Sequence, residues 1–260
     1  MKLYFLSGLP RTGTTLLSSI LNQNSNIHST STSSLLDFLS GVDYVYNEVQ
    51  QRHRSADNRQ LKNIFKSIIS SYYSHLSVPY VIDKWRGWMN NIPQIQEIIV
   101  SNPKIICTYR PIEEIITSFL FLLEKDPNNF IDIELKKRKL ECNNLNRSIY
   151  LWEEGVVGES YRFFQESLNY KKCLYISYNE IVTFPNDTMN KIYDYLEIEI
   201  YPHNFKEIKS TSDDNDDYWQ LKNLHQIRSE IKHCSPNPKK YLTPKLINYF
   251  KQYNKIFDYV

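Results

Sequence analysis

The sequence predicts an α/β fold, a three-layer domain in which helices cover both faces of a central parallel sheet. Short apolar, β-branched runs alternate along the chain with longer segments of helical periodicity, the order expected when crossover helices join parallel strands. The length of 260 residues fits a single domain, residues 1–260, and suffices for a full sheet. With 20 Tyr and 12 Phe against 6 Gly, the composition favours an ordered core over a disordered chain.

The first strand, turn and helix are predicted at residues 3–21. An apolar run at 3–6 leads into a turn of small residues at 7–15, and then into a stretch with helical spacing. The backbone N–H groups of such a loop lack intrahelical partners and lie at the positive end of the helix dipole. We therefore expect an anion to bind there. The apolar side chains that define the helix face are Leu16, Leu17, Ile20 and Leu21.

Two glycines in this turn, Gly8 and Gly13, have the spacing of the nucleotide phosphate loop G-x-x-x-x-G-K-[ST]. A nucleotide triphosphatase needs Lys after the second glycine to reach the β- and γ-phosphates, and this chain has Thr14. The cation is instead Arg11, inside the loop and beside threonine hydroxyls. This arrangement favours a single terminal phosphate over a triphosphate chain.

The remaining elements follow in order from the hydrophobic pattern. Three more strands are predicted at residues 78–84, 104–109 and 172–178. Helices are expected at 35–55, 57–72, 93–101, 112–123, 185–196 and 241–257, with one or two more within 126–168. The Ser- and Thr-rich segment 27–34 is expected to be a polar loop at the carboxyl edge of the sheet and a candidate ligand wall. Residues 203–240 are poorly patterned, and their acidic run 213–217 is interpreted as a solvated loop.

Charge and cysteine usage restrict the partners. The net charge of +2, from 31 basic and 29 acidic residues, provides no global field for nucleic acid or an anionic membrane, so any anion site is local. The 4 cysteines are far apart and form no CxxC motif, which is typical of thiols in a reducing compartment. No stretch approaches roughly 18 consecutive apolar residues, and no basic leader precedes the first strand. We expect a cytoplasmic protein, and its oligomeric state leaves no readable signature.

The loop at residues 9–17, L-P-R-T-G-T-T-L-L, resembles the 5′-phosphate-binding loop of sulfotransferases that use 3′-phosphoadenosine-5′-phosphosulfate (PAPS). It is nearest in style to the tyrosylprotein and carbohydrate enzymes. The resemblance implies a P-loop-like fold and transfer of a sulfuryl group from PAPS to a hydroxyl or amine, with release of adenosine 3′,5′-bisphosphate (PAP). It implies no metal. The residues that would hold the 5′-phosphate are Pro10, Arg11, Thr12, Gly13, Thr14 and Thr15.

Further positions resemble the cofactor site of that family. Arg110 follows the 104–109 strand, and Ser118 on the next helix would complete the clamp for the 3′-phosphate. Arg offers a planar fork of donors that suits phosphate, and Ser adds a hydroxyl. Tyr178, in Tyr-Asn-Glu-Ile, resembles the tyrosine whose flat face lies against the adenine. A late segment covers the cofactor in these enzymes, and His225 and Arg228 are its best matches here.

Lys84 ends the 78–84 strand, where tyrosylprotein-type enzymes carry a lysine close to the bridging oxygen of the sulfate donor. Sulfuryl transfer places negative charge on the departing phosphate, and a preorganised cation stabilises that transition state. Arg11 would hold the same phosphate and therefore belongs to the same catalytic set.

The general base stays open, because tyrosylprotein sulfotransferases carry a Glu after the first helix where this chain has Ser and Thr. Removal of the acceptor proton calls for a His or a carboxylate near the acceptor. The candidates are His28, Asp83, Glu48, His53 and His225.

Two other function classes also stay open. Residues 81–83 resemble the strand that presents a Mg²⁺-binding Asp in P-loop kinases and nucleotide hydrolases, which use Mg-ATP. Thr14 and the clamp at Arg110 oppose this assignment, because ATP has no 3′-phosphate. The lack of an obvious base would fit a catalytically inactive nucleotide-binding module. The acceptor, whether small molecule, carbohydrate or peptide, is not identified by the sequence.

Overall fold

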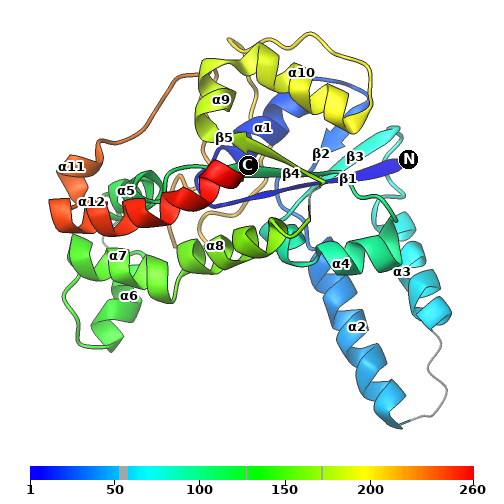
Figure 1. Cartoon of the computed structure of the whole chain (residues 1–260), viewed down its shortest axis with the longest axis horizontal. Coiled ribbons are helices and arrows are strands. Elements are labelled where there is room, and N and C mark those ends of the chain that lie inside the picture. The colour runs from blue at the N-terminus through cyan, green and yellow to red at the C-terminus, as the bar shows by residue number, and fades with distance from the viewer. Residues whose placement is uncertain (53–57, 127, 171, 219) are drawn as a thin grey trace.

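The computed structural model describes residues 1–52, 58–126, 128–170, 172–218 and 220–260. Within these residues, five parallel strands form one sheet in the order β2-β3-β1-β4-β5 (Figure 1). The first strand in the sequence lies at the centre of the sheet, between β3 and β4. The carboxyl ends of all strands meet at one edge, where the loop after β1 also lies. The bounds are β1 Lys2–Gly8, β2 Ile27–Ser29, β3 Tyr80–Lys84, β4 Ile105–Tyr109 and β5 Cys173–Ser177.

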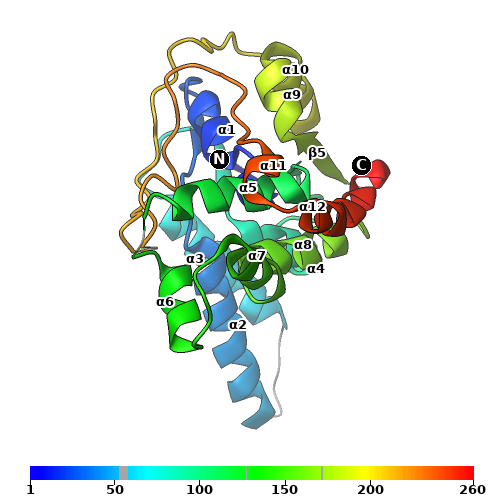
Figure 2. The ribbon, with the colours of Figure 1, turned by 90° about the vertical axis from the view of Figure 1, so that its left-hand side faces the viewer.

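Helices cover both faces of the sheet, which confirms the predicted three-layer α/β fold (Figures 1 and 2). One face packs against α1 Thr14–Leu21, α9 Tyr178–Thr183 and α10 Pro185–Leu196. The other face is covered by α2 Leu35–Arg52, α3 Asn58–Tyr72, α4 Ile92–Gln94, α5 Ile112–Leu123, α6 Phe130–Lys137, α7 Asn144–Glu153, α8 Val156–Ser167, α11 Pro238–Tyr241 and α12 Pro244–Lys251. Shorter 3₁₀ or π segments are η1 Arg86–Asn90, η2 Ile95–Ile99 and η3 Gln252–Tyr259. In the described ranges, no helix is both long and apolar enough to cross a membrane.

Alternate strand residues enter two separate cores. In β1, Phe5 packs on the side of α5, whereas Leu6 packs on the side of α1 and α10. In β3, Val81 and Ile82 divide in the same way. Asp83, the next residue of β3, therefore points to the α5 side, and Lys84, the last one, points to the α1 side.

Three local predictions are corrected by the structure. Residues 27–29 of the expected polar loop form an edge strand, because this segment pairs with β3 and buries Ile27. Region 126–168 contains α6, α7 and α8 rather than one or two helices. Tyr178 starts a helix and does not end a strand, because Ser177 and Glu180 form a capping box at that point.

Candidate functional site

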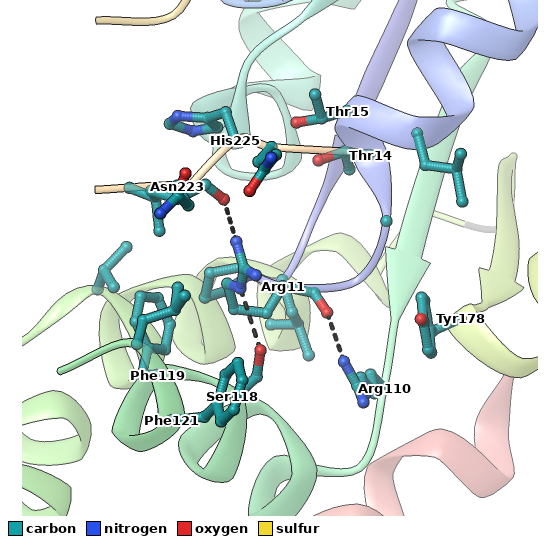
Figure 3. A pocket seen from close by; sticks show the side chains of 18 of the residues that line it. Arg11, Thr14, Thr15, Arg110, Ser118, Phe119, Phe121, Tyr178, Asn223 and His225 are labelled. Carbon is teal, nitrogen blue, oxygen red and sulfur yellow. Dashed lines mark hydrogen bonds between the residues drawn. The ribbon is translucent and has the colours of Figure 1, made fainter. Parts of the chain in front are cut away.

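A cavity of about 1390 Å³ opens at the carboxyl edge of the sheet. Its walls come from the loop after β1, the end of β3, helix α5, the start of α9, the irregular segment 220–237 and helix α11 (Figure 3). The predicted site residues that line it are Pro10, Arg11, Gly13, Thr14, Thr15, Lys84, Arg110, Ser118, Tyr178, His225 and Arg228. Thr12, His28 and Asp83 do not line it.

The loop between β1 and α1 is fixed by contacts with β4. The Leu9 N–H donates to the Thr108 carbonyl at 2.9 Å, and the Thr12 hydroxyl donates to the Leu9 carbonyl at 2.6 Å. Thr12 is fully buried and lies 2.6 Å from the Thr108 hydroxyl. Its hydroxyl therefore shapes the loop, which corrects the expected hydroxyl contact with phosphate. At Gly8, with φ 152°, a Cβ would lie 2.2 Å from Thr108 Oγ1, so the close approach requires glycine.

Helix α1 presents its open N-terminus to the cavity. Gly13 precedes it in the left-handed conformation with φ 83°, and no side chain caps it among the described residues. The first turn also contains no acidic residue. The first backbone N–H groups and the hydroxyls of Thr14 and Thr15 are thus available to an anion.

Arg11 connects the loop to α5 and to the late segment. Its Nε donates to Ser118 Oγ at 3.1 Å, and its Nη1 donates to the Leu224 carbonyl (Figure 3). Burial, reinforced by the charge of Arg110, lowers the pKa of Arg11 to about 10. Arg11 therefore remains a cation at neutral pH, in a pocket where its charge is poorly screened.

Arg110 lies beside Arg11 and contacts its backbone. The side chain is 3 % exposed, and its Nη1 donates to the Arg11 carbonyl at 3.1 Å. Its Nε pairs with Glu114 at 3.0 Å, and its guanidinium carbon lies 4.3 Å from the centre of the Tyr178 ring. The structure thus brings together Arg110, Ser118 and Tyr178, three residues predicted from separate parts of the chain.

Lys84 reaches the same cavity from β3. It is 8 % exposed, and its Nζ donates to Thr15 Oγ1 at 3.2 Å. Burial lowers the pKa of Lys84 to about 8, opposed by the carboxylates of Asp214 and Asp213. The ammonium group is therefore placed at the start of α1, next to the anion-binding N–H groups.

Asp83 has a structural environment on the opposite face of β3. Its carboxylate accepts hydrogen bonds from the Ser33 hydroxyl at 2.5 Å, the Trp88 indole at 2.7 Å and the Tyr73 hydroxyl. The side chain is fully buried, and this burial raises its pKa. Asp83 is thus corrected both as a candidate base and as a candidate Mg²⁺ ligand, because strand alternation directs it away from the cavity.

The other candidate bases differ in whether they line the cavity. His28 lies half-buried on the edge strand β2, where burial lowers its pKa, and it does not line the cavity. Glu48 lies on α2, also outside the cavity walls. His53 lies outside the described residues. His225 is the histidine of this set that lines the cavity.

The acidic run is a loop with Asp213, Asn215 and Asp217 exposed, as expected, but the carboxylates of Asp214 and Asp216 lie partly buried beside His225. Asp216 Oδ1 lies 2.7 Å from His225 Nδ1, and Asp214 Oδ2 lies 4.0 Å from the same nitrogen. Asp214 accepts a hydrogen bond from the Thr32 hydroxyl, and Asp213 accepts one from Ser31. The expected Ser/Thr wall therefore contacts the acidic run, and the 27–34 segment adds only Thr32 to the cavity lining.

Sequence reasoning missed two parts of the site. Arg86 lines the cavity two positions after Lys84, and Asp216 orients His225. Arg86 follows a strand end, which was a usable signal. Asp216 had none, because its partner comes from the fold of an irregular segment. Arg228 lines the cavity as expected and donates to the Cys234 sulfur.

A comparison of the sequence with known protein families finds a match. A sequence model described as the sulfotransferase family matches residues 4–203. The chain belongs to the sulfotransferase family. Curated proteins include no match to this chain.

Solved structures share the fold at low identity. A sulfotransferase domain from the curacin biosynthetic pathway is 18 % identical with a TM-score of 0.57, covering 99 % of this chain and 97 % of that one. A mouse sulfotransferase complexed with PAP is 16 % identical with a TM-score of 0.56, covering 98 % and 82 %. A sulfotransferase from Mycobacterium avium is 14 % identical with a TM-score of 0.53, covering 98 % and 76 %. These likenesses describe the fold.

Proposed function

We propose that this protein transfers a sulfuryl group from PAPS to a hydroxyl or amine acceptor and releases PAP. The observation that supports this best is the convergence of three cations, Arg11, Arg110 and Lys84, around the open N-terminus of α1. A donor with phosphate groups at two ends fits such a site, because the cations lie on both sides of the loop. The mouse protein of the same fold is complexed with PAP, which has this pair of phosphates.

The residues fit the two ends of the nucleotide separately. The first N–H groups of α1, with Thr14 and Thr15, would hold the 5′-phosphate. Arg110 and Ser118 would hold the 3′-phosphate. The Ser118 oxygen accepts a bond from Arg11, and its hydroxyl proton would be donated to the phosphate. Tyr178 would offer its ring to the adenine, and Arg228 would cover the cofactor from the late segment.

Lys84 would stabilise the charge that develops during transfer. The acceptor oxygen forms a bond to sulfur as the bond from sulfur to the bridging oxygen of the 5′-phosphate breaks, and that phosphate takes the electron pair. The Lys84 ammonium, 3.2 Å from Thr15 Oγ1 at the phosphate loop, lies where it can offset this charge. Arg11 supports the same phosphate from the other side of the loop.

His225 is the base that we assign to the acceptor proton. Its Nδ1 faces Asp216 at 2.7 Å, which favours the tautomer that leaves Nε2 as a proton acceptor. Within the described chain, Nε2 has no hydrogen-bond partner. The proton would therefore pass from the acceptor hydroxyl to Nε2, and Asp216 would stabilise the resulting imidazolium.

A Mg-ATP enzyme is the competing function, and the local chemistry opposes it. The strand-end carboxylate that such an enzyme needs would be Asp83, and three protein donors already saturate it away from the cavity. Thr14 also stands where a triphosphate loop has Lys.

Calorimetry with PAP, AMP and ATP, each with and without Mg²⁺, tests the cofactor. PAP is expected to bind tightly without metal, and about tenfold to a hundredfold more tightly than AMP, which lacks the 3′-phosphate. Arg110→Ala should remove most of the PAP preference and leave AMP binding nearly unchanged. A preference for Mg-ATP over PAP would replace this proposal with the kinase function. Release of PAP from PAPS, followed by chromatography, tests the transfer itself.

A further inference from the structure

Arg86 is a cation of the cavity that the proposed donor site does not use. It begins η1, and its backbone is fixed to β1: Ser7 Oγ donates to the Arg86 carbonyl at 2.8 Å, and the Trp85 N–H donates to the Leu6 carbonyl at 3.0 Å. The backbone is therefore positioned as firmly as the sheet itself. The side chain lines the cavity beside Lys84 and Trp85.

The guanidinium group of Arg86 lacks a protein partner among the described residues. It makes no side-chain hydrogen bond and no ion pair there, although it is half-buried in the cavity wall and burial lowers its pKa. Arg11 and Arg110, in contrast, each donate to neighbouring oxygens. A guanidinium has five N–H donors, and leaving them unsatisfied in a poorly solvated pocket is costly. An anion bound in the cavity would satisfy these N–H donors and balance the charge of Arg86.

Two carboxylates, those of Glu159 and Asp214, attract Arg86 electrostatically, but neither forms an ion pair with it. Glu159, on the first turns of α8, is exposed and forms no ion pair with it. Asp214 accepts hydrogen bonds from Ser212 at 2.6 Å and from Thr32, so its oxygens are already engaged. The remaining partner must enter through the cavity.

We propose that Arg86 binds an anionic group, such as a carboxylate, on the acceptor and thereby selects acidic acceptors. This inference rests on the proposed function, because it assumes that Arg11, Arg110 and Lys84 hold the donor. The acceptor would lie between Trp85 and the start of α8, where Gly155 and Val156 also line the cavity. Its anion would meet the guanidinium, and its hydroxyl would face the phosphate loop near Lys84. The same cation could instead contact the donor's sulfuryl oxygens, and the experiment separates these sources.

A matched pair of acceptors tests the selection. Initial rates of PAP formation are measured with 4-hydroxyphenylacetate and with 4-hydroxyphenylacetamide, which have similar shapes but differ in charge. We expect kcat/KM to favour the acid about tenfold or more, the usual effect of a charge-assisted hydrogen bond. In Arg86→Met this preference should fall to near unity, while the rate with the amide changes little. Lys125→Met, which removes another cavity charge that lies 3.7 Å from the Phe121 ring, should keep the preference.

Other results would overturn the inference. Equal use of acid and amide by the native enzyme would do so, as would a preference that survives in Arg86→Met. A variant that binds PAP normally, binds PAPS more weakly and loses both acceptors equally would place Arg86 on the donor sulfuryl group.

A fluorescence measurement decides the question even if neither phenol is turned over. The chain has 4 Trp, so the measurement uses a Trp219→Phe background. In that PAP-saturated protein, iodide should quench the partly exposed Trp85 through attraction to Arg86, whereas Trp88 and Trp152 are buried. Arg86→Met should lower quenching by iodide about twofold without changing quenching by neutral acrylamide. Unchanged iodide quenching would overturn the anion site. Failure of PAP to bind would instead refute the proposed function, and iodide quenching of the free protein would still decide on Arg86.

Discussion

Asp83 and Lys84 are adjacent in the chain and have opposite surroundings. Lys84 meets Thr15 in the cavity, and Asp83 accepts three hydrogen bonds in the core on the other face of β3. The alternation of a strand produces this division, since successive side chains point to opposite faces. We therefore propose a chemical role for Lys84, whereas the contacts of Asp83 are structural.

Removal of the Lys84 ammonium should affect turnover more than binding. In Lys84→Met we expect PAPS turnover to fall about a hundredfold or more, because the charge it offsets develops only in the transition state. PAP affinity, measured by calorimetry, should change less than about tenfold. Turnover equal to that of the native enzyme would exclude Lys84 from the mechanism.

The lowered pKa of Lys84, about 8, also predicts proton uptake on cofactor binding. Above that pH the empty site has a neutral amine, and a bound phosphate raises the pKa by favouring the ammonium form. PAP binding at pH values slightly above 8 should therefore take up a proton, and at pH 6 it should not. Calorimetry in two buffers of different ionisation enthalpy measures the number of protons taken up per PAP bound. Lys84→Met should abolish the uptake, and uptake that persists in the variant would assign it to another group.

The lowered pKa of Lys84 also makes the stability of the folded protein depend on pH. Because the folded-state pKa of about 8 lies below the ordinary value of 10.5, the unfolded chain binds more protons between these pH values. The contribution of Lys84 to the free energy of unfolding of the empty protein therefore rises with pH across that window.

At the scale of elements, Asp83 joins the α2–α3 region to the sheet. Its carboxylate receives Ser33 just before α2, Tyr73 just after α3, and Trp88 in η1. Three elements that cover one face of the sheet are thus tied to a single buried group at the end of β3. Loss of that group leaves three buried donors without their acceptor.

We expect Asp83→Ala to lower the free energy of unfolding by about 3 kcal/mol or more, measured by urea denaturation. Asp194→Ala, at an exposed position of α10, is the matched control and should stay within about 0.5 kcal/mol of the native protein. A loss at Asp83 as small as that of the control would show that the hydrogen-bond hub is energetically unimportant.

At the scale of the whole molecule, the segment between α10 and α11 has little regular structure (Figure 1), and part of it lines the cavity. Two backbone bonds join parts of this segment to each other, from the Ile208 N–H to the Ser229 carbonyl at 2.6 Å and from the Ile231 N–H to the Phe205 carbonyl at 3.0 Å. Its bonds to the rest of the molecule include Arg11 to the Leu224 carbonyl and Arg110 to the Ser235 hydroxyl. The cover of the site is thus attached through side chains of the cavity, one of them from the loop after β1.

PAP binding is expected to slow amide hydrogen exchange in residues 220–236 by about tenfold, because the bound nucleotide adds contacts to a cavity-lining segment that has little regular structure. Mass spectrometry with and without PAP measures this change. Peptides from α10 should exchange at the same rate in both states. Exchange in 220–236 that stays unchanged at saturating PAP would show that this segment does not cover the nucleotide.

Local patterns in the sequence predicted four of the five strands, most of the helices and the loop between β1 and α1. Strand alternation, helical spacing and glycine are local signals, and Gly8, Gly13 and Arg11 lie close together in the chain. The cap at Ser177 and the edge strand at 27–29 were missed because their signals are short.

Which side chains share the cavity could be seen only in the folded structure. The face of β3 separated Lys84 from Asp83, and the path of an irregular segment joined His225 to Asp216. Only its surroundings in the fold show that Arg86 has no partner among the residues that the structure describes. Periodicity fixes how a segment folds locally, whereas the contacts of a site are made between segments far apart in the chain, and no local pattern encodes them.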